Sequence, residues 1–179
     1  MHISAKVDYA VRTLLEIARA PRVSQAQMAA DIPALDATPL VQAGPVITAA
    51  AVVKADVIAT AQCIPPKVLE TVLAELRRAE MVISRRGPDG GYWLARPAAE
   101  ISIADVIRAI EGPLASVRGQ RPEDVNYPGA AEPLQRVWIA LRVNIRAVLE
   151  NVSIEDIAQD RLPEFVETLT EDPGAWARR

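Results

Sequence analysis

Residues 57–97, VIATAQCIPPKVLETVLAELRRAEMVISRRGPDGGYWLARP, decide the fold of this chain. They predict two short helices joined by a tight turn, the first over 57–61. The second helix opens at Pro65-Pro66, where proline is tolerated because the first N–H groups of a helix have no helical partner. Its apolar positions follow the helical period: Val68, Leu69, Val72, Leu73 and Leu76.

A two-stranded hairpin with a basic tip is expected directly after these helices. One strand begins at 81–83, residues 87–90 form a turn, and 92–94 return as the second strand. Pro88 presets the first central dihedral of that turn, and Gly90 suits its last position. The order helix, turn, helix, hairpin is that of a winged helix-turn-helix, whose second helix enters the DNA major groove.

The rest of the chain predicts further helices. An amphipathic helix is expected over 3–19, and another over 102–111, capped by Ser102 with Asp105 three residues on. The fold class is therefore mainly α with a small two-stranded β wing. We expect a DNA-binding domain over 1–97 and a helical dimerisation or effector region over 98–179.

A long helix over 132–151 carries a narrow apolar seam. Its members alternate spacings of four and three, which is the heptad period of paired helices: Leu134, Trp138, Leu141, Ile145 and Val148. About twenty residues at 1.5 Å rise give roughly 30 Å. The seam indicates either a core helix of its own domain or a dimer helix, and its place beside a DNA-binding head favours the dimer.

Residues 21–53 break this regular pattern, with proline at positions 21, 33, 39 and 45. Ser24 and Gln27 suit the cap of a short helix over 25–31. A long irregular segment in a small domain is either disordered or a passive surface excursion, or it is a surface for a partner or ligand. Both interpretations stay open for this segment.

Composition excludes several function classes. The net charge is −3, but residues 54–97 hold seven Lys/Arg against five acids, whereas 98–179 hold nine Arg against fourteen acids. The basic part is thus the expected reading head. We expect a cytoplasmic protein, because the sequence shows no signal peptide, no run of eighteen apolar residues and a single cysteine. The only histidine is His2, and no catalytic set or phosphate loop is visible, so an enzyme is not expected.

Three stretches resemble a known family. The wing RRGPDGGYWLARP, the start ISAKVDYAVRTLLEIA and the run EISIADVIRAIEGP are similar to the winged-helix repressor family that includes IscR, NsrR and CymR. The resemblance covers residues 1–20, 54–112 and, more weakly, 132–160. It implies a homodimeric, sequence-specific repressor of a double-stranded DNA operator, and it makes 21–53 an insertion after the first helix.

The resemblance also implies which residues contact DNA. On the second helix, they are Pro66, Lys67, Glu70 and Thr71, where a merely solvated face is the alternative. In the wing, Arg86 matches an arginine that enters the minor groove, and Gly87, Gly90 and Gly91 let the backbone approach closely. Lys6 and Tyr9 match phosphate-contact positions on the first helix. Tyr92 is expected to pack inward.

Many family members hold an iron–sulfur cluster through three cysteines in the linker before the long helix. The corresponding linker here, residues 113–133, contains neither Cys nor His. Clusters need thiolate ligands, with imidazole as an occasional substitute. We therefore expect no cofactor and no metal, as in the cluster-free branch of the family.

Two positions depart from the family pattern, because Cys63 and Glu80 stand where the family usually has glycine. A side chain at Cys63 requires strain or a shifted turn. This cysteine is either a small turn residue or a redox-sensitive thiol near a helix N-terminus. The alternative function is thus a protein-interaction or thiol-responsive regulator whose DNA binding is weakened, or controlled by a partner protein or a small-molecule effector.

Overall fold

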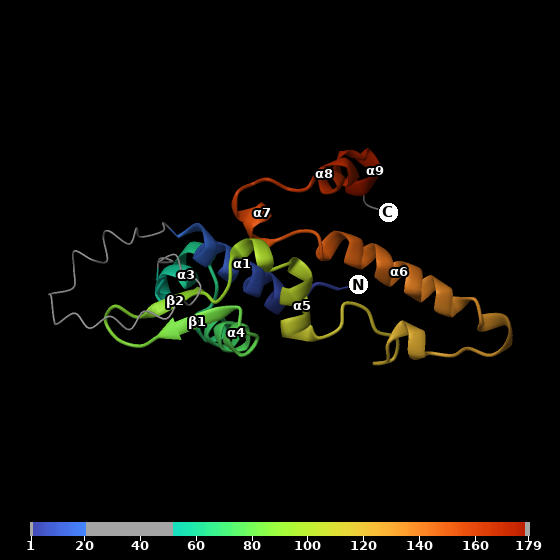
Figure 1. The fold of residues 1–179 in the computed structure, drawn as a ribbon, viewed down its shortest axis with the longest axis horizontal. Coiled ribbons are helices and arrows are strands. Elements are labelled where there is room, and N and C mark those ends of the chain that lie inside the picture. The colour runs from blue at the N-terminus through green and yellow to red at the C-terminus, as the bar shows by residue number, and fades with distance from the viewer. Residues whose placement is uncertain (1, 21–51, 178–179) are drawn as a thin grey trace, which may run out of the picture.

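The computed structural model describes residues 2–20 and 52–177, and it is mostly helical with one two-stranded antiparallel sheet (Figure 1). The fold class expected from the sequence is confirmed. The expected short helix over 25–31 lies outside the described residues. The main elements are α1 (Ala5–Arg19), α3 (Ala55–Gln62), α4 (Pro66–Arg78), β1 (Val82–Arg85), β2 (Gly91–Leu94), α5 (Ile103–Glu111), α6 (Leu134–Leu149), α7 (Ile154–Ala158), α8 (Glu164–Glu171) and α9 (Pro173–Trp176).

The helix-turn-helix consists of α3 and α4, whose axes differ by 117°. This angle falls in the range typical of the motif. Cys63 ends α3 in the left-handed conformation, with φ 51° and ψ 43°. The N–H of Ile64 then reaches the carbonyl of Ala59 at 3.0 Å, which closes the helix in a Schellman pattern. The strained form of the turn is the one adopted.

The end of α4 repeats this pattern. Glu80 has φ 55°, and the N–H of Met81 donates to the carbonyl of Leu76 at 2.9 Å. Glutamate thus takes the left-handed stop position that glycine normally fills. Because Met81 and Leu76 are both buried, the chain enters β1 with its apolar side already on the core.

The wing is an antiparallel hairpin in which Val82 pairs with Leu94 and Arg85 with Gly91. The N–H of Gly90 donates to the carbonyl of Gly87 at 3.0 Å, as the expected turn requires. Tyr92 exchanges two backbone hydrogen bonds with Val53, so the chain just before α3 extends the sheet by one bridge. Tyr92 packs against the core, as expected.

The core surrounds α1, which contacts α3, α4, α5, β2 and α7. The helix begins at Ala5 rather than at residue 3, because Ser4 caps it through a hydrogen bond from the N–H of Val7. Ile3 therefore stays outside the helix and half-exposed. One buried cluster includes residues from both halves of the chain: Leu14, Ile58, Leu73, Leu76, Val82, Ile101, Val106 and Ile154.

The chain leaves this core and returns to it. Ser102 caps α5 with the expected capping box, and Gly112 ends the helix with φ 88°. After α6, Ser153 caps α7 in the same way, and a bridge between Ser102 and Ser153 ties the two helix starts together. The boundary at residue 97 remains a proposal, since Ile101 and Ile154 beyond it belong to the same core.

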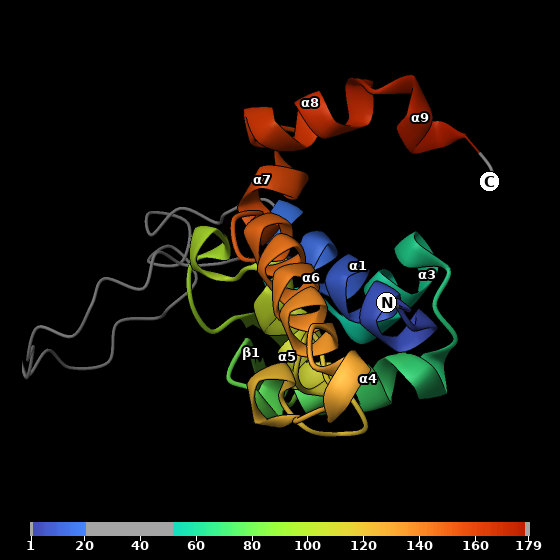
Figure 2. The same ribbon diagram turned by 90° about the vertical axis from the view of Figure 1, so that its right-hand side faces the viewer.

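The long helix α6 extends away from the head, and α8 and α9 stand apart from it (Figures 1 and 2). None of the residues of α6 is fully buried within the chain. Among the described residues, no single helix is long and apolar enough to cross a membrane. The bent pair α3 and α4 would qualify by length and composition, but most of its large apolar residues pack into the core.

Candidate nucleic-acid interface

The exposed face of α4 brings together the residues expected to read DNA. The helix packs on the core through Leu69, Val72, Leu73 and Leu76. Its opposite side exposes Pro66, Lys67, Glu70 and Thr71. The hydroxyl of Thr71 donates to the carbonyl of Lys67 at 3.1 Å, which satisfies the hydroxyl locally. Both charged side chains of this face are therefore presented to solvent near the N-terminus of α4.

Two further arginines continue this face, and the sequence interpretation did not assign them. Arg77 and Arg78 are exposed in the last turn of α4. Arg77 donates to the hydroxyl of Ser84 at 3.4 Å, which links α4 to the wing. Their spacing of seven from Glu70 and Thr71 is the helical signal that would have found them. Basic side chains here can neutralise phosphates on either side of a groove.

The wing presents Arg86 at its tip. Arg85 donates to the backbone carbonyl of Asp89 at 3.0 Å and so braces the turn. Arg86 is exposed and makes no hydrogen bond or ion pair within residues 2–20 and 52–177. An arginine placed in this way on a hairpin can enter a narrow minor groove.

The three wing glycines differ in their surroundings. Gly87 is exposed, with φ 115° and open space where a Cβ would lie. A Cβ on Gly90 would lie 2.3 Å from the carbonyl oxygen of Arg85, and one on Gly91 would lie 2.6 Å from that of Val53. The packing of the hairpin alone thus requires glycine at 90 and 91.

Lys6 and Tyr9 on α1, the two residues expected to contact phosphates, make contacts with other residues of the chain instead. The ammonium of Lys6 lies 2.6 Å from Oε1 of Glu75 on α4. Tyr9 is half-buried against the core, and the guanidinium of Arg12 lies 5.7 Å from its ring centroid. Lys6 therefore has to leave Glu75, or share it, before it can contact a phosphate.

Arg12 is a positioning residue that the sequence interpretation missed. Its guanidinium donates to the backbone carbonyl and to the side chain of Gln62, the last residue of α3. It also pairs with Asp8 one turn earlier on α1, at 3.2 Å. A cation at a helix C-terminus is stabilising, so Arg12 fixes α3 on α1. The spacing of four from Asp8 was the only sequence signal.

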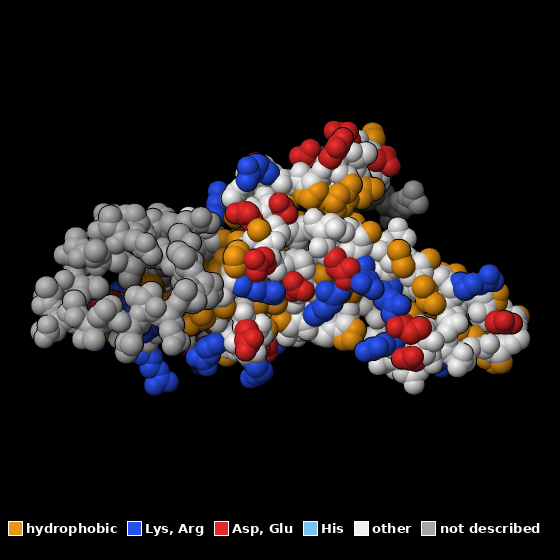
Figure 3. Space-filling model, in the orientation of Figure 1, with side chains coloured by type: hydrophobic (Ala, Val, Ile, Leu, Met, Phe, Trp, Pro, Cys, Tyr) orange, Lys and Arg blue, Asp and Glu red, His pale blue; other side chains and the backbone are white. Residues whose placement is uncertain are grey.

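Figure 3 shows basic side chains along the edge that carries α4 and the wing, with acidic side chains between them. The exposed charges of α4 and the wing comprise five cations and three anions: Lys67, Arg77, Arg78, Arg85, Arg86, Glu70, Glu80 and Asp89. This modest positive excess suits phosphate contact. Within the described residues, no group of three or more His, Cys, Asp or Glu could hold a metal ion.

The carboxyl groups with altered pKa values lie away from this interface. Hydrogen bonds from the hydroxyl and backbone of Ser153 lower the pKa of Asp156. Hydrogen bonds from Arg146 and Arg108 lower the pKa of Glu150. That of Glu123 is lowered by a hydrogen bond from its own backbone and then by Arg142. All three carboxylates are therefore ionised at neutral pH.

Comparison with known proteins agrees with this architecture. The family described as "Rrf2: iron-dependent transcriptional regulator" matches residues 47–160. An HTH-type transcriptional regulator of Mycobacterium tuberculosis is 42% identical over 172 residues, covering 96% of this chain and 90% of the relative. The solved structure of CymR, described as the global cysteine regulator of Bacillus subtilis, has a TM-score of 0.62 and 25% identity. It covers 89% of this chain and 98% of CymR.

The iron chemistry in the family description does not fit the residues of this chain. The linker between α5 and α6 offers no thiolate and no imidazole, and Cys63 lies at the turn of the helix-turn-helix instead. One thiolate cannot supply the four ligands of an iron–sulfur cluster.

Sequence, fold and exposed reading helix thus lead to one assignment. The match covers more than half of the chain, and the structure has the winged helix-turn-helix of the solved relatives. This chain belongs to the Rrf2 family and is a DNA-binding transcription regulator.

Proposed function

We propose that this regulator is a homodimeric, cluster-free repressor that reads an operator through α4 and the wing. The observation that carries this proposal is the exposed face of Lys67, Glu70 and Thr71 on α4, beside Arg86 at the wing tip. Because the proposed partner is chromosomal DNA, the protein would act in the cytoplasm.

In this proposal α4 enters the major groove. Lys67 meets guanine acceptors, Glu70 accepts from cytosine N4, and the methyl group of Thr71 touches a thymine methyl. Arg77 and Arg78 bind the flanking phosphates, which sets the register but reads no sequence. Arg86 enters the adjacent minor groove and reads its width.

The proposed dimer forms through α6. The polar side of this helix, together with Trp138 of the predicted seam, holds the linker of its own chain. Gln135 donates to the carbonyl of Val125 at 2.8 Å, Trp138 donates to the hydroxyl of Tyr127 at 3.1 Å, and Arg142 pairs with Glu123. The apolar side chains of Val137 and Leu141 are left 54% and 46% exposed. Leu141 is the exposed member of the predicted seam, whereas Leu134, Trp138, Ile145 and Val148 are half-buried within the chain, and Val137 lies one turn before Leu141, outside that seam. Pairing of this exposed side with a second copy would bury Val137 and Leu141 and place two reading helices about 34 Å apart on a pseudo-palindrome.

A second function, control through a thiol or a protein partner, has one observation in its favour. Cys63 is an exposed free cysteine at the turn between α3 and α4, with Sγ 3.8 Å from the carbonyl of Thr60. Chemistry at this thiol would disturb the reading helix directly. In its strong form, this alternative describes a protein that no longer binds DNA. A measurement of binding to the protein's own promoter therefore distinguishes this alternative from the proposed repressor.

The contribution of the wing is tested by the Arg86→Ala variant. We expect this change to weaken specific DNA binding by about 1–3 kcal/mol, the usual value for a groove-reading arginine. The measurement is a fluorescence-anisotropy titration of a labelled fragment of the protein's own promoter at fixed salt. Arg136→Ala is the matched control, because Arg136 is an exposed arginine on α6. Unchanged affinity in Arg86→Ala would refute the role of the wing.

A further inference from the structure

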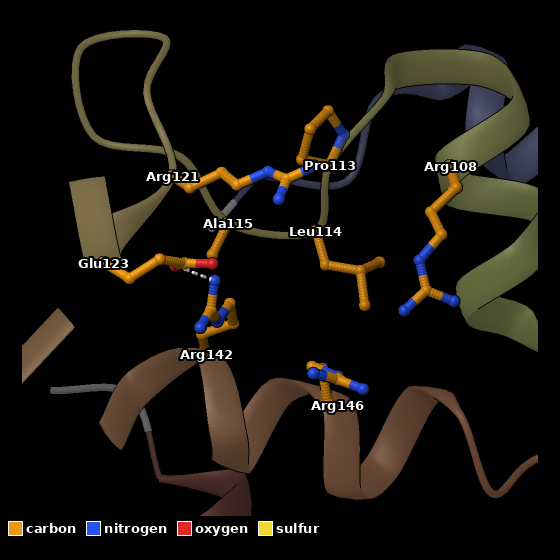
Figure 4. A pocket seen from close by; sticks show the side chains of 8 residues that line it. All are labelled: Arg108, Pro113, Leu114, Ala115, Arg121, Glu123, Arg142 and Arg146. Atoms are coloured by element: carbon orange, nitrogen blue, oxygen red, sulfur yellow. Dashed lines mark hydrogen bonds and ion pairs between the residues drawn. The ribbon is translucent and has the colours of Figure 1, made fainter. Parts of the chain in front are cut away.

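A pocket of about 320 Å³ lies between α5, the linker and the polar side of α6. Figure 4 shows arginines that reach it from three parts of the chain: Arg108 from α5, Arg121 from the linker, and Arg142 and Arg146 from α6. Pro113, Leu114 and Ala115 form an apolar wall beside them. None of these residues belongs to the DNA-reading surface.

The charges around this pocket leave a positive excess. Glu150 pairs with Arg108 and with Arg146, and Asp105 lies 3.6 Å from Arg108. Glu123 lines the pocket and pairs with Arg142. Three acids, Glu150, Asp105 and Glu123, therefore face four arginines. Asp105 also pairs with Arg96.

Two of the arginines keep free donors within the described part of the chain, Arg142 in a buried position and Arg121 in an exposed one. Nε of Arg142 is buried and lacks a hydrogen-bond partner. Arg121 has no ion pair among residues 2–20 and 52–177. A buried donor that lost its water and gained no acceptor costs free energy, so Nε of Arg142 requires an explanation, and a bound water or ion is one.

We propose that this pocket binds a small oxyanion, a metabolite that carries carboxylate or phosphate groups. The planar guanidinium forks of Arg121, Arg142 and Arg146 suit two-point contacts to such groups. The apolar wall of Leu114 and its neighbours suits the carbon skeleton, and 320 Å³ is at the lower end of small-ligand sites. Glu123 occupies Arg142 in the ligand-free protein and competes with the ligand.

The place of the pocket connects it to the reading head. The helix that carries Arg108, α5, packs on α4, and α6 carries the proposed dimer seam. A ligand that clamps α5 to α6 would therefore act on both the reading helix and the spacing of the two heads. Ligand binding itself does not depend on the proposed function, whereas this effect on DNA affinity rests on it.

Isothermal titration calorimetry of the full-length protein, without DNA, tests the site. The probes are citrate, inorganic phosphate and fructose 1,6-bisphosphate, with sodium chloride at matched ionic strength as the blank. Citrate separates carboxylate recognition from phosphate recognition. We expect saturable binding of at least one probe below about 10 mM, and none of the blank.

Three variants then define the residues. Arg142→Gln should raise the Kd of the bound probe at least about tenfold, the usual effect of losing a charged hydrogen bond. Glu123→Gln should lower the Kd, because it removes the internal competitor for Arg142. Arg136→Gln, an exposed arginine of α6 outside the pocket, should leave it unchanged. If Arg142→Gln does not fold by circular dichroism, Arg121→Gln takes its place.

Opposite signs for Arg142→Gln and Glu123→Gln would distinguish a binding site from a merely structural ion pair. Absence of saturable binding for all three probes would overturn the proposal, as would equal weakening in Arg136→Gln. Loss of DNA affinity in Arg142→Gln, without binding of any probe, would assign these arginines to DNA phosphates and would also overturn it.

Discussion

At the scale of single residues, Cys63 and Glu80 hold left-handed backbone conformations with φ 51° and 55°. Such a conformation costs an L-residue about 1–2 kcal/mol, because its Cβ crowds the following carbonyl. Both residues close a helix of the reading motif by the same hydrogen-bond pattern. The motif thus keeps the backbone conformation that glycine would favour at these two positions, and the side chains of Cys63 and Glu80 lower its stability.

The first prediction concerns Glu80→Gly. We expect this variant to be more stable by up to about 1 kcal/mol, since the relief of strain exceeds the entropy that glycine adds to the unfolded chain. Ala79→Gly is the control: Ala79 has φ −83°, so glycine there relieves no strain, adds the entropic cost, removes a methyl group packed on the core and should destabilise the protein. Urea unfolding followed by circular dichroism measures both. Equal destabilisation by the two changes would show that the conformation at residue 80 is not strained.

At the scale of elements, the features that were predicted correctly from the sequence are those that local patterns determine. The capping box at Ser102, the wing turn and the long helix were each confirmed, the last within two residues at either end. Each of these depends on residues close together in the chain. The start of α1 was misjudged because the apolar Ile3 extends the helical pattern, whereas the cap at Ser4 decides where the helix begins.

The candidate site was predictable only in part, for a related reason. The exposed face of α4 follows from helical spacing. The pair between Lys6 and Glu75 joins residues 69 positions apart, and the contact of Arg12 with Gln62 joins residues 50 apart. No periodicity encodes such contacts, because they depend on how α1 lies against α3 and α4. The arginine pocket was missed for the same reason.

The prediction at this scale concerns α6. Leu141→Glu would place a carboxylate in the proposed seam, where an unpaired buried charge costs several kcal/mol, so the subunits should separate. Leu141 is 46% exposed within one chain, and the subunit itself should therefore stay folded. Val143→Glu is the control, since Val143 is 58% exposed and outside the seam. Sedimentation equilibrium measures the mass. A monomeric wild type at micromolar concentration would refute the dimer, and a dimeric Leu141→Glu variant would place the dimer surface elsewhere.

At the scale of the whole molecule, α6 projects from the core around α1. Both α5, which precedes it, and α7, which follows it, pack on α1. The strand-like contact of Ser102 with Ser153 places the start of α5 beside the end of α6 (Figure 1). The core residue Ile154 then fixes α7 on α1. A dimer built on α6 would therefore hold its two heads at a defined separation, which is what a palindromic operator requires.

The central claim, that this chain reads an operator as a dimer, is tested most directly by titrating the wild-type protein against its own promoter fragment. Fluorescence anisotropy at about 0.15 M salt should show binding at least about 10³-fold tighter than to a shuffled sequence of equal length. The end point should correspond to two chains per site. Equal affinity for the two fragments, or saturation at one chain per site, would contradict the account.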